Sequence, residues 1–206
     1  MFSIRGKDIR FGLGGIKGAS TKTLHNIVEQ RNKTGEFKHL DHLVSKVGTK
    51  KLTKKDLEYL VKVGAMKEFG HQNQLLEIIP LVYDKMQNRE KSLQGGQTML
   101  FGSKEDEVAM TPLPTVARVE NMQELLWEKE ILGTYISQHP LDRFKTKVYV
   151  NNFTSLQQAS KMPSKSKFST IGMFTRIKKI YTKRDAKAMA FVEVEDIEGK
   201  VEGVIF

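Results

Sequence analysis

A glycine-rich turn followed by an amphipathic helix is the first pattern in the sequence with a chemical use. Residues 12–20 contain four glycines and lead into residues 21–31, where apolar side chains recur with helical spacing. Ser20 is placed to cap this helix, and the small residues Gly18 and Ala19 leave backbone N–H groups open at the positive end of the helix dipole. Together with Lys17 and Lys22, this pattern predicts a phosphate-binding turn.

A second unit has the same organisation. Thr53 and Asp56 form an expected capping box, an apolar helical face follows, and Gly64 and Ala65 form a second short turn. Two such units in a basic region predict tandem hairpins that hold a phosphate backbone without reading bases. The alternative is that either glycine turn only ends a helix. Dinucleotide and nucleoside-triphosphate loops are excluded, because neither glycine signature is met.

Acidic side chains near the C-terminus could in principle bind a divalent metal for nuclease chemistry. Glu193, Glu195, Asp196 and Glu198 lie on a predicted strand end and turn. A metal-dependent nuclease is therefore a rival hypothesis, although we assign no catalytic residue. His39 and His42 have helical spacing but no third ligand is evident, so we assign no metal site.

Charge divides the 206-residue chain into three blocks. The net charge is +10, with basic excesses in residues 1–70 and 144–206 and an acidic excess in residues 71–143. Two basic blocks predict two polyanion-binding units, although solvated lysine-rich faces are an alternative. The absence of cysteine excludes disulfides and thiolate sites, and no apolar run is long enough for a membrane span, which favours a cytoplasmic protein without membrane partners.

The acidic block contains a short apolar peptide between glycines. Gln97, Met99, Leu100 and Phe101 follow Gly95 and Gly96, and this arrangement suits insertion into an apolar pocket of a partner. The alternative is a loop that packs back on neighbouring helices. Residues 122–132 then form an expected packing helix, in which Trp127 is a core residue rather than a ligand platform.

The second basic block alternates in the manner of strands. Phe174, Arg176 and Lys178 are expected on one face of a sheet, with Met173, Thr175 and Ile177 on the other. Aromatic and basic side chains on an exposed sheet suit single-stranded nucleic acid, and the candidates are Phe174, Arg176, Lys183 and Arg184. Glu193 and Glu195 would repel phosphate, so an inert surface is the alternative.

The order of these motifs resembles the bacterial replicative DNA polymerase III alpha-subunit family. The resemblance rests on motifs spread along nearly the whole chain: Ile9–Leu13, Ile16–Gly18, Leu57–Leu60, Gly64–Ala65, Glu128–Glu130, Leu132–Ser137, His139–Leu141, Thr182–Arg184, Met189–Phe191 and Val201–Phe206. One departure is Ser20, where the family usually has glycine, so the first hairpin is expected to be less open to phosphate.

The resemblance implies an α+β chain that is mainly a helical tandem helix-hairpin-helix domain followed by a partial OB-fold β-barrel. The expected divisions are a duplex-DNA-binding domain at residues 1–92, a clamp-binding loop at 93–118, a helical connector at 119–160 and a truncated OB domain at 161–206. The implied DNA contacts include Lys17, Gly18, Ala19, Ser20, Lys22, Gly64 and Ala65, and the implied clamp contacts are Gln97, Met99, Leu100 and Phe101.

The implied function is part of template-directed DNA synthesis. Implied partners are duplex DNA, single-stranded template DNA, the sliding clamp and other replicative polymerase subunits. The catalytic aspartates and Mg²⁺ of the family belong to a palm domain expected upstream, so no cofactor is assigned to this segment and the enzyme activity is left to the missing domains. A stand-alone DNA-binding adaptor without catalysis is the alternative.

Overall fold

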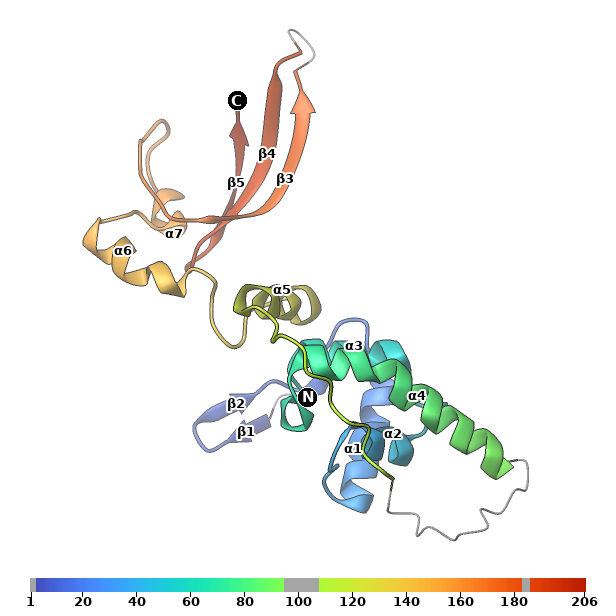
Figure 1. Cartoon of the computed structure of the whole chain (residues 1–206). Coiled ribbons are helices and arrows are strands. Elements are labelled where there is room, and N and C mark those ends of the chain that lie inside the picture. The colour runs from blue at the N-terminus through green and yellow to red at the C-terminus, as the bar shows by residue number, and fades with distance from the viewer. Residues whose placement is uncertain (1–2, 95–107, 183–185) are drawn as a thin grey trace. The chain divides into compact units, whose positions relative to one another are not determined.

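The structure is a computed structural model that describes residues 3–94, 108–182 and 186–206. It divides into two compact units, Met1–Tyr135 and Ile136–Phe206. The first unit is largely helical and the second carries a three-stranded antiparallel sheet (Figure 1). The α+β fold class is therefore confirmed, and the division falls inside the expected connector of residues 119–160.

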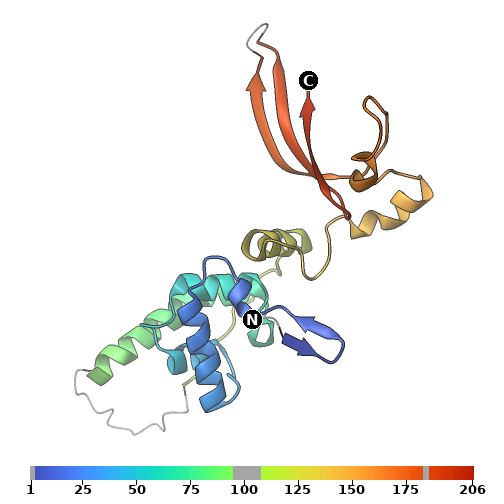
Figure 2. The ribbon, with the colours of Figure 1, turned by 180° about the vertical axis from the view of Figure 1, so that it is seen from behind.

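The first unit begins with a short hairpin and continues with helices. Strands β1 (Ser3–Arg5) and β2 (Asp8–Arg10) pair antiparallel and lie to one side of the helices (Figure 2). The elements that follow are η1 (Leu13–Gly15), α1 (Thr21–Thr34), α2 (Leu40–Val47), α3 (Lys54–Lys62), η2 (Lys67–Phe69), α4 (Gln72–Gln94) and α5 (Asn121–Leu132). The two helices that the sequence predicts after residues 20 and 53 begin where expected.

One apolar core holds these helices together. Leu57 and Leu60 of α3 are almost fully buried against Leu75 and Ile79 of α4, and Ile131 of α5 joins the same cluster. Trp127 packs partly buried against this core, as expected, whereas Leu126 is 45% exposed. Helix α5 therefore belongs to the hairpin unit by its packing.

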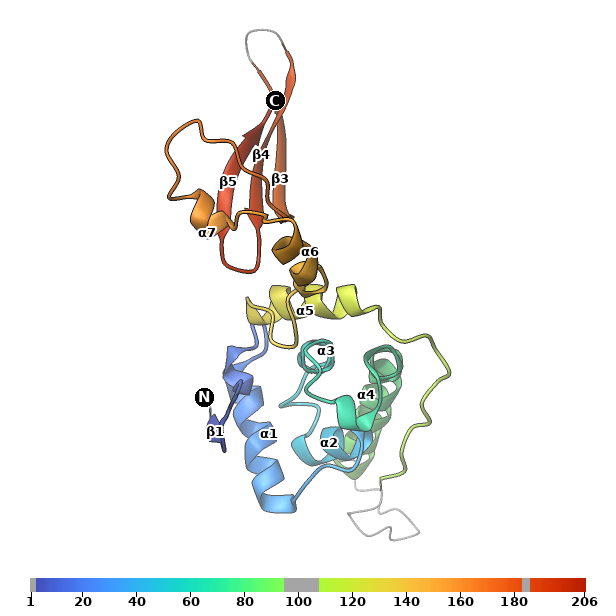
Figure 3. The same cartoon turned by 90° about the vertical axis from the view of Figure 1, so that its left-hand side faces the viewer.

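A segment without helix or strand precedes α5 and runs beside α4 (Figure 3). Its backbone is held by side chains of α4, because Gln74 Nε2 donates to Pro114 O at 3.0 Å and Asn73 Nδ2 donates to Ala117 O at 2.8 Å. At its start, Thr111 donates from its backbone N–H and its hydroxyl to the buried carboxylate of Asp41. These bonds fix residues 109–118 on the helical unit.

The second unit contains η3 (Asp142–Phe144), α6 (Lys145–Val150), α7 (Leu156–Ala159), β3 (Met173–Tyr181), β4 (Ala188–Glu195) and β5 (Lys200–Ile205). The sheet order is β3-β4-β5, and both neighbouring pairs are antiparallel. Val192 at the middle of β4 is buried, but Phe174, Ile177 and Tyr181 of β3 are more than half exposed. The sheet therefore covers little apolar surface within this unit.

None of the helices in the described ranges has the length and apolarity to cross a membrane.

Candidate nucleic-acid interface

The first hairpin turn owes its shape to Gly18. This residue has φ +87°, and a Cβ there would lie 2.6 Å from Cε2 of Tyr59 on α3. Only glycine combines this left-handed backbone with such a close approach. The preceding residue is fixed from the other side, because Lys17 N donates to Ile131 O at the end of α5 at 2.9 Å. The turn is thus held between α3 and α5.

The start of α1 is left open by an unusual cap. Ser20 occupies the N-cap position that the sequence predicts, but its side chain makes no capping hydrogen bond. Its backbone N–H instead donates to Asp56 Oδ1 at 3.2 Å, and Thr23 Oγ1 donates to Asp56 Oδ2 at 3.4 Å. A carboxylate of α3 therefore fixes the entry to α1.

Four backbone N–H groups beside this cap have no hydrogen-bond acceptor within the described residues. Among the described residues, no acceptor is found for the backbone N–H groups of Gly18, Ala19, Thr21 and Lys22. Gly18 and Lys22 are exposed, and the positive end of the α1 dipole faces the same region. Open amides at the start of a 14-residue helix form a site suited to an anion.

Three lysines lie on the elements that form this turn. Lys17 and Lys22 are exposed, as the predicted phosphate site requires, and the Lys17 ammonium lies beside Gly133 at the C-terminal end of α5. Lys55 was not identified from the sequence: its Nζ lies 5.6 Å from the centroid of the Tyr59 ring, and this ring contacts Gly18. The i, i+4 spacing of Lys55 and Tyr59 on α3 was the available signal.

In the second predicted turn, the backbone N–H groups form hydrogen bonds within the chain. Gly64 has φ +73°, its N–H donates to Val61 O at 2.9 Å, and Ala65 N donates to Leu60 O at 2.9 Å. This is the Schellman pattern that ends a helix. Because both donors are engaged, any phosphate bound near this turn must be held by other groups. The DNA-binding role of Gly64 and Ala65 stays a prediction.

The sheet separates two side chains that the sequence placed together. Phe174 pairs with Val194 while Arg176 pairs with Glu193, so Thr175 is an extra residue in β3. Neighbouring residues of β4 face opposite sides, and therefore Phe174 and Arg176 lie on opposite faces. The expected common face of Phe174, Arg176 and Lys178 is corrected by this bulge, which simple alternation cannot reveal.

Arg176 and Lys178 share their face with two carboxylates. A shallow groove of about 240 Å³ is lined there by Arg176, Lys178, Phe191, Glu193 and Glu202 among others. Hydrogen bonds from Thr175 and Lys200 hold the pKa of Glu193 below its ordinary value, so this side chain stays ionised at neutral pH. The groove therefore offers mixed charge to a single strand.

Several predicted contacts lie outside the described residues. They are Gln97, Met99, Leu100 and Phe101 of the expected clamp peptide, and Lys183 and Arg184 of the expected single-strand site.

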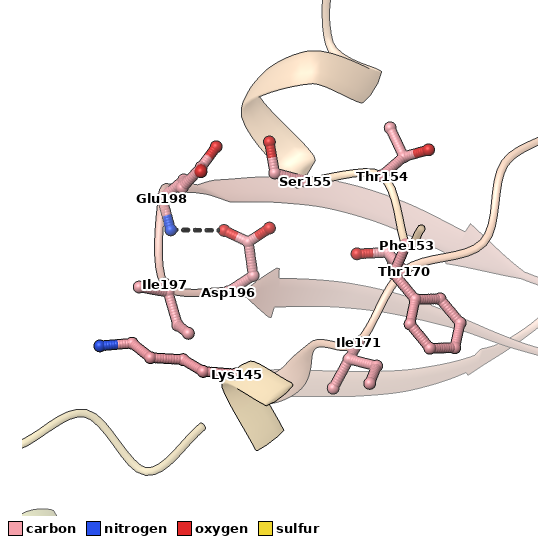
Figure 4. A pocket seen from close by; sticks show the side chains of 9 residues that line it. All are labelled: Lys145, Phe153, Thr154, Ser155, Thr170, Ile171, Asp196, Ile197 and Glu198. Carbon is pink, nitrogen blue, oxygen red and sulfur yellow. Dashed lines mark hydrogen bonds between the residues drawn. The ribbon is translucent and has the colours of Figure 1, made fainter. Parts of the chain in front are cut away.

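One carboxylate of the nuclease hypothesis, Asp196, has a structural role. Asp196 is 8% exposed and accepts hydrogen bonds from the backbone N–H groups of Leu156, Glu198 and Gly199 at 2.6 to 2.8 Å. Figure 4 shows it beside a pocket of about 180 Å³, with Phe153, Ile171 and Ile197 forming apolar walls. Across residues 3–94, 108–182 and 186–206, no three side chains of His, Asp or Glu are grouped to hold a metal ion.

The two histidines with helical spacing are engaged in hydrogen bonds at the start of α2. His39 Nδ1 accepts from the backbone N–H of His42 at 3.2 Å, and His42 Nδ1 accepts from the backbone N–H of Lys38 at 3.1 Å. Their ring centroids are 6.0 Å apart. These nitrogens cap the helix.

An open glycine turn that leads into α1 and is held between α3 and α5 is the geometry of a helix-hairpin-helix motif. A family model described as "Helix-hairpin-helix motif" matches residues 1–76.

The chain belongs to the DNA polymerase III alpha-subunit family, as a relative of one segment of it. It is 35% identical over 206 residues to the DNA polymerase III subunit alpha of Aquifex aeolicus, an alignment that covers all of this chain and 16% of that protein. The subunit of Helicobacter pylori is 32% identical over 208 residues, covering 97% of this chain and 17% of the relative. That of Deinococcus radiodurans is 35% identical over 145 residues, covering 69% and 11% respectively. The chain thus spans about one sixth of the first two relatives.

Proposed function

We propose that this chain is the part of a replicative DNA polymerase alpha subunit that holds duplex DNA by its phosphate backbone. The observation that carries this proposal is the open start of α1, where unpartnered amides of Gly18, Ala19, Thr21 and Lys22 adjoin three lysines. Amides and lysines recognise phosphate without regard to base sequence. Binding is therefore expected to be independent of sequence and steeply dependent on salt.

The same proposal assigns the chain a second tether. The peptide containing Leu100 and Phe101 would bind the sliding clamp, with Gln97 and Met99 completing the contact. A polymerase held both by DNA and by a ring on that DNA has a raised effective concentration at the primer end. The contribution of this segment is processivity, and nucleotide addition with its Mg²⁺ resides in other domains. Further contacts with replicative subunits belong to the same proposal.

A weaker single-strand contact is proposed for the sheet. It would use Arg176 together with Lys183 and Arg184, with Phe174 contributing separately because it lies on the other face. The carboxylates of Glu193 and Glu202 beside Arg176 predict that this contact is weaker than that of the hairpin.

The test is fluorescence anisotropy of the full chain with a labelled duplex and a labelled single strand, between about 50 and about 300 mM salt, where counterion release is pronounced. The chain should bind the duplex more tightly than the single strand, and without preference for base sequence. Replacing both Lys17 and Lys22 with Ala should lower the salt slope by about 2. Duplex binding with an unchanged slope in that variant would place the phosphate contacts elsewhere. The clamp tether is tested by replacing Leu100 and Phe101 with Ala, which should abolish clamp binding and leave DNA affinity intact.

A further inference from the structure

Helix α3 carries two neighbouring lysines that each lie against a tyrosine ring. Lys54 Nζ is 5.3 Å from the ring centroid of Tyr83 on α4, and Lys55 Nζ is 5.6 Å from the ring centroid of Tyr59 on α3 itself. A cation over an aromatic face is attracted by the ring quadrupole, so both ammonium groups are held near their rings. The two pairs share this contact and differ in the partners of their polar groups.

The Lys54–Tyr83 pair is satisfied within the chain. Lys54 Nζ forms an ion pair with Asp84 at 2.7 Å, and Tyr83 OH donates to Thr49 O at 2.8 Å. Both polar ends of this pair therefore have a protein partner, and the pair needs no ligand.

The Lys55–Tyr59 pair has no such partners. Across residues 3–94, 108–182 and 186–206, the Tyr59 hydroxyl has no hydrogen-bond partner and Lys55 forms no ion pair. Lys55 is exposed, and Tyr59 is partly buried with its hydroxyl oxygen open to solvent. This pair thus offers one neutral donor and one positive charge to a ligand.

The position of the hydroxyl says which ligand it can meet. A Cβ at Gly18 would lie 3.0 Å from Tyr59 OH and 2.9 Å from Tyr59 Cζ, so the edge of the ring stands directly beside the first glycine turn. The backbone N–H of Gly18 has no acceptor in the part of the chain that the structure describes. An amide of the turn and a hydroxyl of α3 are therefore close enough to share one phosphate group, whose oxygens accept hydrogen bonds from both kinds of donor.

We propose that Tyr59 is a phosphate ligand, whose hydroxyl donates to an oxygen of the DNA backbone phosphate held at Gly18, with Lys55 supplying charge beside the same group. The inference rests on the proposed function and deepens it, because it adds a side-chain contact from α3 to a site built from backbone amides before α1. The phosphate is then held from two elements of the helical unit. A hydroxyl on a packed ring also has a more restricted position than a lysine ammonium on a flexible stem.

The first experiment compares the duplex affinity of the full chain with that of Tyr59→Phe and Tyr83→Phe. Tyr59→Phe keeps the ring beside Gly18 and removes only the hydroxyl. Affinity at about 100 mM salt should fall roughly three- to tenfold, with the salt slope unchanged because the hydroxyl is neutral. Tyr83→Phe removes the bond to Thr49, so it should lower the melting temperature and leave duplex affinity unchanged.

Two results would overturn the role of Tyr59. One is unchanged duplex affinity in Tyr59→Phe. The other is a loss of affinity accompanied by the same fall in melting temperature as in Tyr83→Phe, because the effect would then come from folding. A loss in the Lys17 and Lys22 double variant without one in Tyr59→Phe refutes the Tyr59 contact alone, whereas no duplex binding by the unsubstituted chain refutes the proposed function.

Two lysine substitutions test the charge beside the ring. Lys55→Ala should reduce the salt slope by about 1. Lys54→Ala removes an ammonium that is already paired with Asp84, so it should change the slope less. Equal changes in the two variants would overturn the role of Lys55.

A further experiment does not depend on DNA. Inorganic phosphate is titrated into the ¹⁵N-labelled full chain, and the amide signal of Gly18 is followed. It should shift, and the apparent dissociation constant should rise severalfold in Tyr59→Phe but not in Tyr83→Phe. An equal constant in Tyr59→Phe would overturn the hydroxyl contact. Weaker phosphate binding without any loss of duplex affinity in Tyr59→Phe would overturn nucleic acid as the source of the phosphate.

Discussion

The helical unit and the sheet unit present basic charge in opposite ways. In the helical unit, lysines surround backbone amides whose positions are fixed by a continuous apolar core. In the sheet unit, Arg176 and Lys178 project from a sheet with one buried residue, and the carboxylates of Glu193 and Glu202 line the same groove. Backbone donors on a packed scaffold are preorganised, whereas long side chains on an open sheet must be ordered by the ligand. Basic charge alone therefore does not make the two units equivalent.

Core substitutions should separate the two units most strongly. Leu57→Ala in α3 removes a fully buried side chain and should lower the free energy of unfolding by about 2 to 5 kcal/mol. Ile177→Ala in β3, where the side chain is 64% exposed, should change it by less than about 0.5 kcal/mol. Urea unfolding followed by circular dichroism measures both. Similar losses would show that the exposed face of the sheet is covered in solution.

Each unit has a buried carboxylate, and the one in the helical unit, Asp41, makes stability depend on pH. Burial alone would raise the pKa of Asp41, but hydrogen bonds from Lys85 and Thr111 outweigh it and hold the pKa below the ordinary value. Its contribution to stability is therefore present above about pH 4 and is lost as pH falls through the lowered pKa. Asp41→Asn should lower the free energy of unfolding by about 1 to 3 kcal/mol at neutral pH and should make stability less dependent on acid pH. Thermal melting from pH 7 to pH 3 measures the effect.

Asp196→Asn in the sheet unit is the matched substitution. Asp196 is bound by three backbone N–H groups, and no Lys or Arg of the described residues forms an ion pair with it, so the variant keeps an acceptor but loses the charge. A loss confined to the sheet unit, with duplex affinity unchanged, would support independent units. A loss of duplex affinity would contradict the placement of the main site at the hairpin.

Two glycine substitutions test whether the shape of the first hairpin turn affects DNA binding separately from backbone strain. Gly18→Ala and Gly35→Ala both force alanine into a left-handed backbone, with φ +87° and +82°. Only at position 18 would the new Cβ meet a side chain, that of Tyr59, since nothing lies within 4 Å at Gly35. Backbone strain should lower the free energy of unfolding of both variants by about 1 kcal/mol. The contact with Tyr59 should lower it further in Gly18→Ala, which should also bind duplex DNA less tightly. Equal binding by the two variants would contradict the role of the turn.

The smallest effect is expected on the sheet. Glu193→Gln removes a carboxylate, held ionised by Thr175 and Lys200, from the face of Arg176. Affinity for a labelled single strand should rise about twofold, because the exposed charge is screened by solvent. Thr175→Ala, which removes the bond but not the charge, is the control. A decrease in the Gln variant would indicate that Glu193 takes part in binding.

The helices and the exposed glycine turn before α1 were accessible from sequence because their signals are local, whereas the DNA-binding role of this turn stays a prediction. The Thr53–Asp56 capping box, the glycine that ends α3 and the start of α1 after Ser20 were correctly predicted. Long-range features were not accessible. The cap that Asp56 provides to Ser20 joins residues 36 positions apart, and the continuation of α4 through Pro80 depends on the packing of its neighbours.

The sheet shows the limit more clearly. Thr175 is a single extra residue in β3. Because of it, the residues from Arg176 onward lie on the opposite faces from those that strict alternation from Phe174 predicts. Nothing in the alternation of side chains marks this position. The bulge depends on pairing with β4, so it became visible only with the register. The bonds from Asn73 and Gln74 to the segment before α5 likewise join residues 44 and 40 positions apart.

The bond from Lys17 N to Ile131 O has a mechanical consequence. It joins the glycine turn before α1 to the last turn of α5, only a few residues before Tyr135, where the first unit ends. A pulling force applied to the chain beyond Tyr135 would thus be borne first by α5 and by this bond, ahead of the central core. Tension along the chain would therefore reach the glycine turn before α1 earlier than it would unfold the core of the unit.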